Sequence, residues 1–273
     1  MNQIMDIEDF KRPEWKSVLA EMHSLMNIKR ANLEKFPHCT DRRNLFEKAE
    51  IESFKHWEYP WMIKHSKLKS GQKILDCGCG RGFLQFYLAR KGMKVTSLDV
   101  STLKPKFVRK FWKFCEDKKI PLSENKTITI PKIAKRYDTN VEFHVLNIAK
   151  LPFNDNSYDC VYSISVLEHM EKGDDEDAIR EMARVLKPGG RMLVTVDFSP
   201  IKIPRVSYDA KDIERLINIS GLEQIGESCD YQIENWTEHK KQLKDTFLKV
   251  DVSVSTAGFV LQKKKLCKFL NLL

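Results

Sequence analysis

The sequence lacks the features that mark several protein classes. No stretch of its 273 residues approaches the ~18 consecutive apolar residues that a membrane span requires, so we expect no transmembrane segment. The N-terminal stretch MNQIMDIEDFKRPEW contains no apolar core of the kind found in secretory signals, which predicts a cytoplasmic protein. There is no internal repeat or low-complexity tract, and hydrophobic residues make up 42% of the chain, as in globular proteins.

Cysteine is present but follows no structural framework. Seven cysteines is an odd number, and their spacing is irregular, which is typical of reduced thiols rather than of a disulfide-stabilised domain. Cys77 and Cys79 form a C-x-C pair, but no second pair supplies the other half of a zinc site. We therefore expect small buried thiols in a tight turn at these two positions.

The charge balance leaves the partner open. The formal net charge of +9 is compatible with a nucleic acid, an anionic substrate or a membrane surface. The most basic stretch, Leu103 to Lys119, has phenylalanines at helical spacing, and we favour an amphipathic helix with a solvated lysine face over a nucleic-acid groove. Residues 266–273 are expected to form a packed or frayed tail, although contact with a membrane or with a second subunit of a homodimer stays open.

Short apolar runs alternate with amphipathic segments from Lys73 onward. This alternation predicts an α/β fold with a doubly wound, Rossmann-like sheet of seven strands, mostly parallel with an antiparallel last strand. Residues 1–70 are polar and helix-like, and we expect them to form an N-terminal helical cap or lid over a ligand-binding domain of residues 71–265. The expected strands are 73–77, 94–100, 141–148, 158–165, 191–198, 222–228 and 250–264, and the expected helices include 83–92, 174–190, 207–221 and 234–246.

A glycine-rich turn joins the first strand of this sheet to the first helix. The stretch ILDCGCGRGFL places Gly78, Gly80 and Gly82 where a ligand can approach the backbone and meet the free N–H groups of the helix N-terminus. The third glycine comes one residue too early for the dinucleotide-binding fingerprint, which needs glycine at the position of Phe83. The turn therefore predicts a ligand other than a dinucleotide.

Two carboxylates narrow the choice of ligand. Asp76, two residues before Gly78, would repel a pyrophosphate but suits a ligand with an ammonium group. Asp99 ends the second strand, where a carboxylate can accept hydrogen bonds from both hydroxyls of a ribose. A ribose, an ammonium group and no pyrophosphate together suggest S-adenosylmethionine.

Four motifs in this order carry a family resemblance. They are D-x-G-x-G-x-G, an acid at the end of the second strand, NIAKLPFNDNSYDCVYSISVLEHM, and IREMARVLKPGGRMLVTV. The chain from Lys73 to Phe198 resembles the class I S-adenosylmethionine-dependent methyltransferases, most closely the type 11 subfamily of ubiquinone- and menaquinone-pathway enzymes. The resemblance implies S-adenosylmethionine as the cofactor, S-adenosylhomocysteine as its product, and a cofactor-binding methyltransferase domain in residues 71–265.

The resemblance also implies roles for residues at matching positions. The loop after the first strand would surround the methionine part, and Asp99 would bind the ribose with Val100 against adenine. Asn147 stands where the family usually has Asp, and for Asn147 and Ser165 a local cap is an equal alternative to cofactor contact. The implied cofactor-binding residues are Asp76, Gly78, Cys79, Gly80, Gly82, Asp99, Val100, Asn147, Ile148, Ser163 and Ser165.

The acceptor side of the site is less defined. Glu168 and His169 follow the fourth strand and are the candidate catalytic residues, with a structural role for His169 as the alternative. In relatives of the ubiquinone O-methyltransferase type, a glutamate three residues before this pair helps to hold a divalent cation; here that residue is Ser165, so we expect no metal. Three aromatic residues of the cap are expected either to wall the acceptor pocket or to fasten the helices to the sheet: Trp57, Tyr59 and Trp61.

Two further absences bear on the acceptor. No Asn-Pro-Pro-aromatic motif follows the fourth strand, and no Pro-Cys pair occurs, which disfavours N6-adenine, glutamine-amide and cytosine-C5 methylation. We therefore expect transfer to an oxygen or nitrogen atom of a small molecule, with nucleic acid an unlikely partner. An RNA or protein methyltransferase, and a non-catalytic protein that binds the cofactor as a regulatory ligand, are the alternatives.

Overall fold

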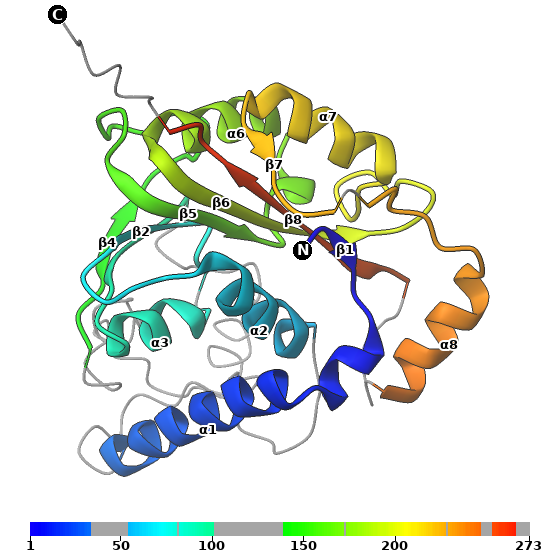
Figure 1. The fold of residues 1–273 in the computed structure, drawn as a ribbon, viewed down its shortest axis with the longest axis horizontal. Helices are drawn as coiled ribbons and strands as arrows, with labels where there is room; N and C mark the ends of the chain where they lie inside the picture. The colour runs from blue at the N-terminus through cyan, green and yellow to red at the C-terminus, as the bar shows by residue number, and fades with distance from the viewer. Residues whose placement is uncertain are drawn as a thin grey trace, which may run out of the picture.

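The parallel strands β2 to β6 form the centre of a mixed eight-stranded sheet (Figure 1). The order is β1-β8-β6-β5-β2-β3-β4, with β7 also paired to β8, and β8 runs antiparallel to β6. The strands are β1 (Gln3–Ile4), β2 (Lys73–Cys77), β3 (Lys94–Asp99), β4 (Glu142–Val145), β5 (Tyr158–Ile164), β6 (Leu186–Phe198), β7 (Glu223–Gln224) and β8 (Ser255–Gln262). This computed structural model describes residues 1–33, 54–80, 82–100, 139–171, 173–227, 229–246 and 253–265.

Helices cover both faces of the sheet. In Figure 1, α1 (Pro13–Leu33), α2 (Lys55–Ser66) and α3 (Leu84–Arg90) lie on one face, and α6 (Asp174–Val185) and α7 (Ala210–Ser220) on the other. The remaining elements are the short 3-10 helices η1 (Ile7–Lys11) and η3 (Leu167–His169) and the helix α8 (Trp236–Thr246). None of the helices in the described ranges combines the length and the apolar character that a membrane crossing requires.

The core consists of two apolar layers because successive strand residues point to opposite faces. Ile74 belongs to the layer under α1, α2 and α3, and its neighbour Leu75 to the layer under α6 and α7. The second layer receives the apolar stripe of α6, including Ile179 and Met182, which are fully buried. This two-layer arrangement confirms the predicted doubly wound fold with an antiparallel last strand.

Two details differ from the sequence prediction. The sheet has eight strands rather than seven, because Gln3–Ile4 pairs with β8 beside the equally short β7. The segment predicted as a helix over 174–190 leaves the helix at Val185, and Leu186 already begins β6. The basic stretch from Leu103 to Lys119 and the tail 266–273 lie outside the described residues.

The N-terminal segment is anchored to the sheet and to α2. The side-chain amide of Asn2 donates to the carbonyl groups of Ile225 and Glu227 and accepts the N–H of Val260 on β8. Asp9 is fully buried and accepts hydrogen bonds from the Trp57 indole at 2.8 Å and from the Gln3 amide at 2.8 Å. The position of α2 over the sheet therefore depends on residues near the start of the chain.

We expect Asp9→Ala to lower the free energy of unfolding by about 2–4 kcal/mol, because it leaves a buried indole N–H and amide without their acceptor. Glu8→Ala removes the adjacent acid, which is exposed and pairs only with the exposed Lys11, and should cost less than about 0.5 kcal/mol. Urea unfolding followed by tryptophan fluorescence measures both. Equal losses in the two variants would show that the Asp9 contacts do not hold this segment.

Candidate active site

The loop after β2 has a closed side and an open side. The N–H groups of Gly78 and Cys79 both donate to the carbonyl of Leu98 at 2.9 Å, which ties the loop to β3. Gly78 has a φ of +80°, and a Cβ there would lie 2.6 Å from the side chain of Val166. At Gly80, where φ is +49°, a Cβ would meet no atom of the described residues within 4 Å. A ligand can therefore approach the backbone on the Gly80 side.

Asp76 lies directly under this loop and is 5% exposed. Its carboxylate accepts a hydrogen bond from the Tyr162 hydroxyl at 2.8 Å. Burial raises the pKa of Asp76 to about 7, the Tyr162 hydrogen bond opposes this shift, and the negative charge of Asp99 adds to it. A ligand ammonium would stabilise the charged form, and the pairing of Asp76 with an ammonium group stays a prediction.

The opposite wall of the loop is formed by the ends of β3 and β4. Asp99 accepts the N–H of Gly80 at 3.0 Å through one carboxylate oxygen, and the next residue, Val100, is 67% exposed. The N–H of Leu146 donates to the Asp99 carbonyl, so the residue after it, Asn147, lies near this edge. An exposed apolar side chain beside a carboxylate is the arrangement that a nucleoside needs, with a ring against Val100 and hydroxyls at Asp99.

Asn147 and Ile148 differ in exposure. Asn147 is exposed, and its side-chain oxygen accepts the N–H of Ala149 at 3.0 Å, which is the local turn that was one of the two alternatives. The Ile148 side chain is buried in the core, so a ligand contact would come through its backbone N–H, which the family resemblance implies faces an adenine ring nitrogen. Their assignment as adenine-binding residues stays a prediction.

The thiols in the loop are unsuited to metal binding as they stand. Cys77 and Cys79 are both buried, and burial raises the pKa of each thiol above its ordinary value. The nearby Asp76 carboxylate raises both values further. A protonated thiol is a poor metal ligand, which agrees with the interpretation of these residues as packing groups.

The end of β5 contacts α2 through a buried carboxylate. Ser165, which has a φ of +51°, donates its hydroxyl to Glu58 on α2 at 2.6 Å, and Thr195 on β6 donates to the same oxygen at 2.7 Å. Lys55 forms an ion pair with the other oxygen at 2.7 Å. We name these four side chains the α2 latch. Ser163, by contrast, is fully buried, and no described residue hydrogen-bonds to its hydroxyl.

A second acid cluster lies beside the α2 latch. Glu168 is 2% exposed; one of its oxygens accepts the N–H of Asp197 at 2.7 Å, and the other has no hydrogen-bond partner among the described residues. Burial and the Asp197 carboxylate raise the pKa of Glu168, and burial and Glu58 raise the pKa of Asp197 to about 6. Both shifts favour the protonated carboxyl groups, and a cation bound beside them would favour the charged forms.

His169 adds a nitrogen to this cluster. Its Nδ1 lies 3.0 Å from the carbonyl oxygen of Arg205, which can only accept, so Nδ1 carries the hydrogen and Nε2 is the basic atom of the neutral ring. Donor atoms of Glu168, His169 and Asp197 lie within 4.8 Å of one another, close enough to share a metal ion. The expectation of no metal, which rested on Ser165, stays a prediction, and this cluster was not found from the sequence because Asp197 lies on another strand.

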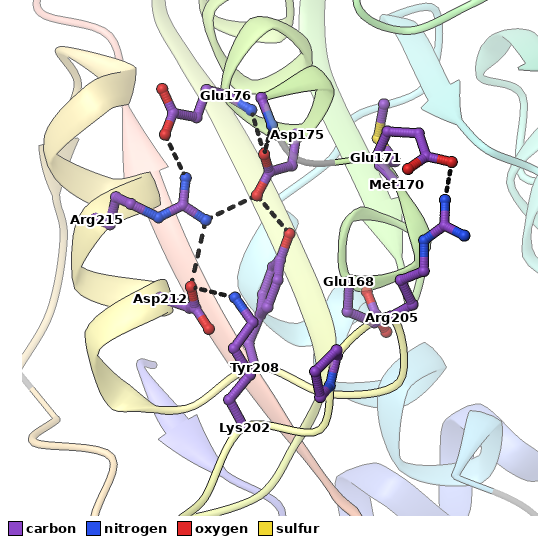
Figure 2. Close-up of a pocket in the computed structure, with 12 residues that line it drawn as sticks. Glu168, Met170, Glu171, Asp175, Glu176, Lys202, Arg205, Tyr208, Asp212 and Arg215 are labelled. Atoms are coloured by element: carbon purple, nitrogen blue, oxygen red, sulfur yellow. Dashed lines mark hydrogen bonds and ion pairs between the residues drawn. The ribbon is translucent and has the colours of Figure 1, made fainter.

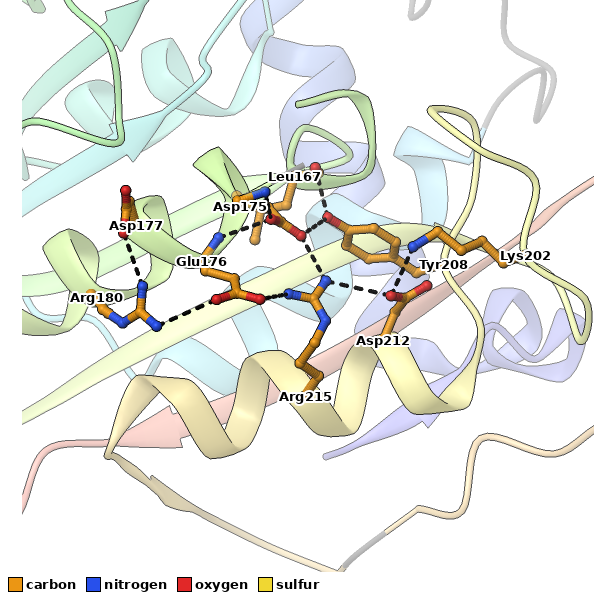
Figure 3. Close-up of polar contacts among 10 residues, drawn as sticks. Leu167, Asp175, Glu176, Asp177, Arg180, Lys202, Tyr208, Asp212 and Arg215 are labelled. Carbon is orange, nitrogen blue, oxygen red and sulfur yellow. Dashed lines mark hydrogen bonds and ion pairs between the residues drawn. The ribbon is translucent and has the colours of Figure 1, made fainter. Parts of the chain in front are cut away.

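A pocket of about 390 Å³ opens beside Glu168, between η3, α6, α7 and the segment after β6 (Figure 2). Its wall is mostly charged. Arg215 pairs with Asp175 and with Glu176, each at 2.7 Å, and Lys202 pairs with Asp212 at 2.8 Å (Figure 3). The lining residues are Glu168, Met170, Glu171, Gly173, Asp175, Glu176, Lys202, Pro204, Arg205, Tyr208, Asp212 and Arg215.

The aromatic residues of the cap do not line this pocket. Trp57 and Trp61 are fully buried, stack on each other, and donate their indole N–H groups to Asp9 and to the carbonyl of Met1. Tyr59 is 4% exposed, and its hydroxyl accepts the N–H of Phe83 beside the glycine loop. Trp57 and Trp61 therefore fasten α2 to the N-terminal segment, and only Tyr59 reaches the loop that a cofactor would contact.

Sequence reasoning missed three acids and bases of the site, namely Lys55, Glu58 and Asp197. Glu58 did carry a signal, because it lies between Trp57 and Tyr59 in a run whose other members are apolar or aromatic. A charged residue in such a run indicates a buried, compensated group. Asp197 carried none, because only the pairing of β5 with β6 brings it beside Glu168.

Sequence comparison relates this chain to known methyltransferases. Residues 75–194 match the family model of a methyltransferase domain. The ubiquinone/menaquinone biosynthesis C-methyltransferase of Hahella chejuensis is 41% identical over 109 residues, covering 39% of this chain and 43% of that protein. Phosphoethanolamine N-methyltransferase 3 of Arabidopsis thaliana is 29% identical over 171 residues, covering 58% of this chain and 30% of that protein. The matches thus span about half or less of these relatives' length.

The fold likewise has relatives among solved structures. The [4+2]-cyclase SpnF superposes with a TM-score of 0.50 at 18% identity, covering 77% of this chain and 81% of that chain. Because a protein named as a cyclase shares the fold, the fold alone does not establish the reaction. The sequence match over 75–194, which includes the glycine loop and Glu168, carries the assignment of the domain.

The two glycines of the loop allow a paired test. Gly80→Ala places a methyl group in open space on the ligand side, so cofactor affinity should fall about 10-fold or more while the unfolding free energy drops by only about 1 kcal/mol. Gly78→Ala collides with Val166 and should cost about 1–3 kcal/mol of stability. Calorimetric titration with S-adenosylhomocysteine and urea unfolding give the two quantities. Normal affinity in Gly80→Ala would exclude the loop as the binding site.

Proposed function

We propose that this chain, which contains a class I S-adenosylmethionine-dependent methyltransferase domain, transfers a methyl group to a small-molecule acceptor bound in the pocket beside Glu168. The observation that carries the proposal is the adjacency of two parts. The open glycine loop with Asp76 and Asp99 fits the cofactor. Val166 lies against Gly78 in this loop and directly precedes η3, whose residue Glu168 lines the pocket. Cofactor and acceptor would thus meet at the ends of β2 and β5.

The residues present fit S-adenosylmethionine. Asp76 offers a buried carboxylate to an ammonium group, Asp99 offers a carboxylate to the ribose, and Gly80 leaves room for the chain between them. When bound, the cofactor supplies an electrophilic methyl group on a sulfonium. The protein's part is then to hold the acceptor in line and to exclude water, since alignment in a dry site supplies much of the rate.

The chain offers means for both tasks. The α2 latch holds α2 across the ends of β5 and β6, because Glu58 is fully buried and accepts hydrogen bonds from both strands. Nε2 of His169 can accept a proton from an acceptor hydroxyl or ammonium group, because Nδ1 is already committed to Arg205. Both elements lie at the carboxyl end of the sheet, where we expect the acceptor atom.

Two observations favour a small molecule over RNA. The pocket has the volume of a small-molecule site, and its wall has more acidic than basic residues, which disfavours a phosphate backbone. The named relatives include both a C-methyltransferase and an N-methyltransferase, so the acceptor atom does not follow from the family. A non-catalytic binder is the remaining alternative, and only turnover distinguishes it.

Incubation with methyl-labelled S-adenosylmethionine tests the proposal, with a metabolite extract, an RNA fraction and a protein fraction as separate acceptor pools. We expect label in the metabolite pool, and less of it with Gly80→Ala at a cofactor concentration below saturation. Label in RNA or protein would overturn the small-molecule acceptor, and cofactor binding with no label in any pool would favour the regulatory alternative.

The raised pKa of Asp76 predicts how cofactor affinity depends on pH. A bound ammonium favours the charged carboxylate, so affinity for S-adenosylhomocysteine should fall as the pH drops below about 7, by up to about tenfold per pH unit. In the free protein the neutral carboxyl contributes stability that is lost as the pH rises from about 4 to about 7. Titration calorimetry at several pH values measures the first effect. Asp76→Asn should bind weakly with little pH dependence, and an unchanged pH profile in this variant would assign the titration to another group.

A further inference from the structure

The charge of the candidate pocket is opposite to the charge of the whole chain. The protein carries a formal net charge of +9, yet the residues that line the pocket include five carboxylates and three basic side chains. A local potential of this sign attracts cationic ligands and repels anionic ones, whatever the overall charge. The pocket is therefore selective by charge.

The basic side chains of the pocket are already paired with its acids. Arg215 contacts Asp175 and Glu176, as Figures 2 and 3 show, and Arg205 pairs with Glu171 on the other side of the pocket. Lys202 pairs with Asp212. An anionic acceptor would have to displace a carboxylate from one of these cations. A cationic acceptor meets the same competition at the four paired acids, but not at Glu168, which has no ion pair among the described residues.

Glu168 is the acid of the pocket that lacks this compensation. Its side chain is 98% buried, and its Oε2 has no hydrogen-bond partner among the described residues. Ligand atoms of Glu168 and Asp197 lie within 4.8 Å of each other, and Lys55, whose charge acts on Glu168, is already paired with Glu58 at 2.7 Å. A buried carboxylate oxygen without a donor costs free energy, which a ligand N–H or ammonium group would recover.

We propose that Glu168 and Asp197 recognise the amine of the methyl acceptor, so that the methylated atom is a nitrogen. This inference rests on the proposed function and names its substrate class. The acceptor binds as an ammonium, which favours the charged form of both carboxyl groups, with its carbon skeleton against Met170 and Tyr208. An alcohol or phenol of the same size gains nothing from the second negative charge.

The reaction balances with the groups at hand. The ammonium first gives its proton to Nε2 of His169, which the Nδ1 contact with Arg205 leaves unprotonated in the neutral ring. The nitrogen lone pair then forms the carbon–nitrogen bond as the carbon–sulfur bond breaks, and the sulfur keeps the electron pair of that bond as a thioether. The nitrogen becomes a methylated ammonium, and the proton on His169 passes to solvent, to which the ring is exposed.

Cation recognition can be tested without turnover. Tetramethylammonium cannot be methylated, and tert-butanol is a neutral molecule of similar size. We expect tetramethylammonium, but not tert-butanol, to bind wild-type protein saturated with S-adenosylhomocysteine, as followed by ligand-observed NMR. Glu168→Gln keeps the acceptor for the Asp197 N–H and removes one charge, so it should weaken tetramethylammonium binding about 10-fold or more. Asp177→Asn removes one charge from exposed α6 surface outside the pocket and should leave binding unchanged.

Two results would overturn the proposal. Equal binding of the neutral and charged probes would show that the pocket does not select by charge. Magnesium binding that depends on Glu168, without any binding of tetramethylammonium, would assign the cluster to a metal ion.

The labelled product separates this inference from the function on which it rests. Label recovered in metabolites that partition as bases, with the methyl group on nitrogen by mass spectrometry, supports both. Label on oxygen or carbon retains the methyltransferase and rejects the amine acceptor. No label in any pool rejects the proposed function itself, whereas the probe experiment still reports on the pocket.

Discussion

Burial of carboxylates at the carboxyl ends of the parallel strands is the constraint on which the rest of this structure depends. A carboxylate removed from water needs hydrogen-bond donors or a cation, or else it takes up a proton. Asp76 accepts a hydrogen bond from the Tyr162 hydroxyl, and Asp99 accepts one from the N–H of Gly80. Glu58 accepts hydrogen bonds from the hydroxyls of Ser165 and Thr195. Each of these acids holds one segment in place: Asp76 holds β5, Asp99 holds the glycine turn, and Glu58 holds α2. The geometry of the site is thus a consequence of satisfying its charges.

The same requirement places the cap. Asp9 is fully buried and is satisfied by Gln3, Arg12 and Trp57, which belong to β1, the end of η1 and α2. The next residue on α2, Glu58, is satisfied from the other side by β5 and β6. Two buried acids, one below and one within α2, therefore set its position. A helix held from both sides in this way covers the strand ends in a fixed position.

Much of the fold and half of the site followed from local sequence. The strand-turn-helix around Gly78 and the acids Asp76 and Asp99 are predictable, because alternation, glycine spacing and strand ends are encoded within a few residues. Strand β1 was missed because two residues carry no periodicity; its partner β8 supplies the pairing. The sequence left two roles open for Trp57 and Trp61, a pocket wall or fastening of the cap. Their complete burial fits the second role, because large apolar side chains near a sheet are more often buried between layers.

The acceptor side was less predictable because it depends on contacts distant in sequence. Glu168 was named from its motif, but its partner Asp197 lies on another strand, and Glu58 lies on a helix before the domain. The net charge of +9 also gave no indication of an acidic pocket, because most of the basic residues that produce it do not line the pocket. Local charge, which decides ligand choice, became visible only when the strand order was known.

The electrostatics of the acceptor cluster suit transfer to nitrogen for a reason that goes beyond attraction. Methyl transfer from a sulfonium to a neutral amine moves one positive charge over a few ångströms and neither creates nor removes it. In the proposed reaction the positive charge lies on the sulfonium before the step and on the acceptor nitrogen beside Glu168 after it, while the ammonium group of the cofactor stays at Asp76 throughout. In a site of low dielectric, such constancy avoids the cost of leaving a buried carboxylate uncompensated. Transfer to a phenolate would instead abolish both charges and leave Glu168 facing an uncharged product.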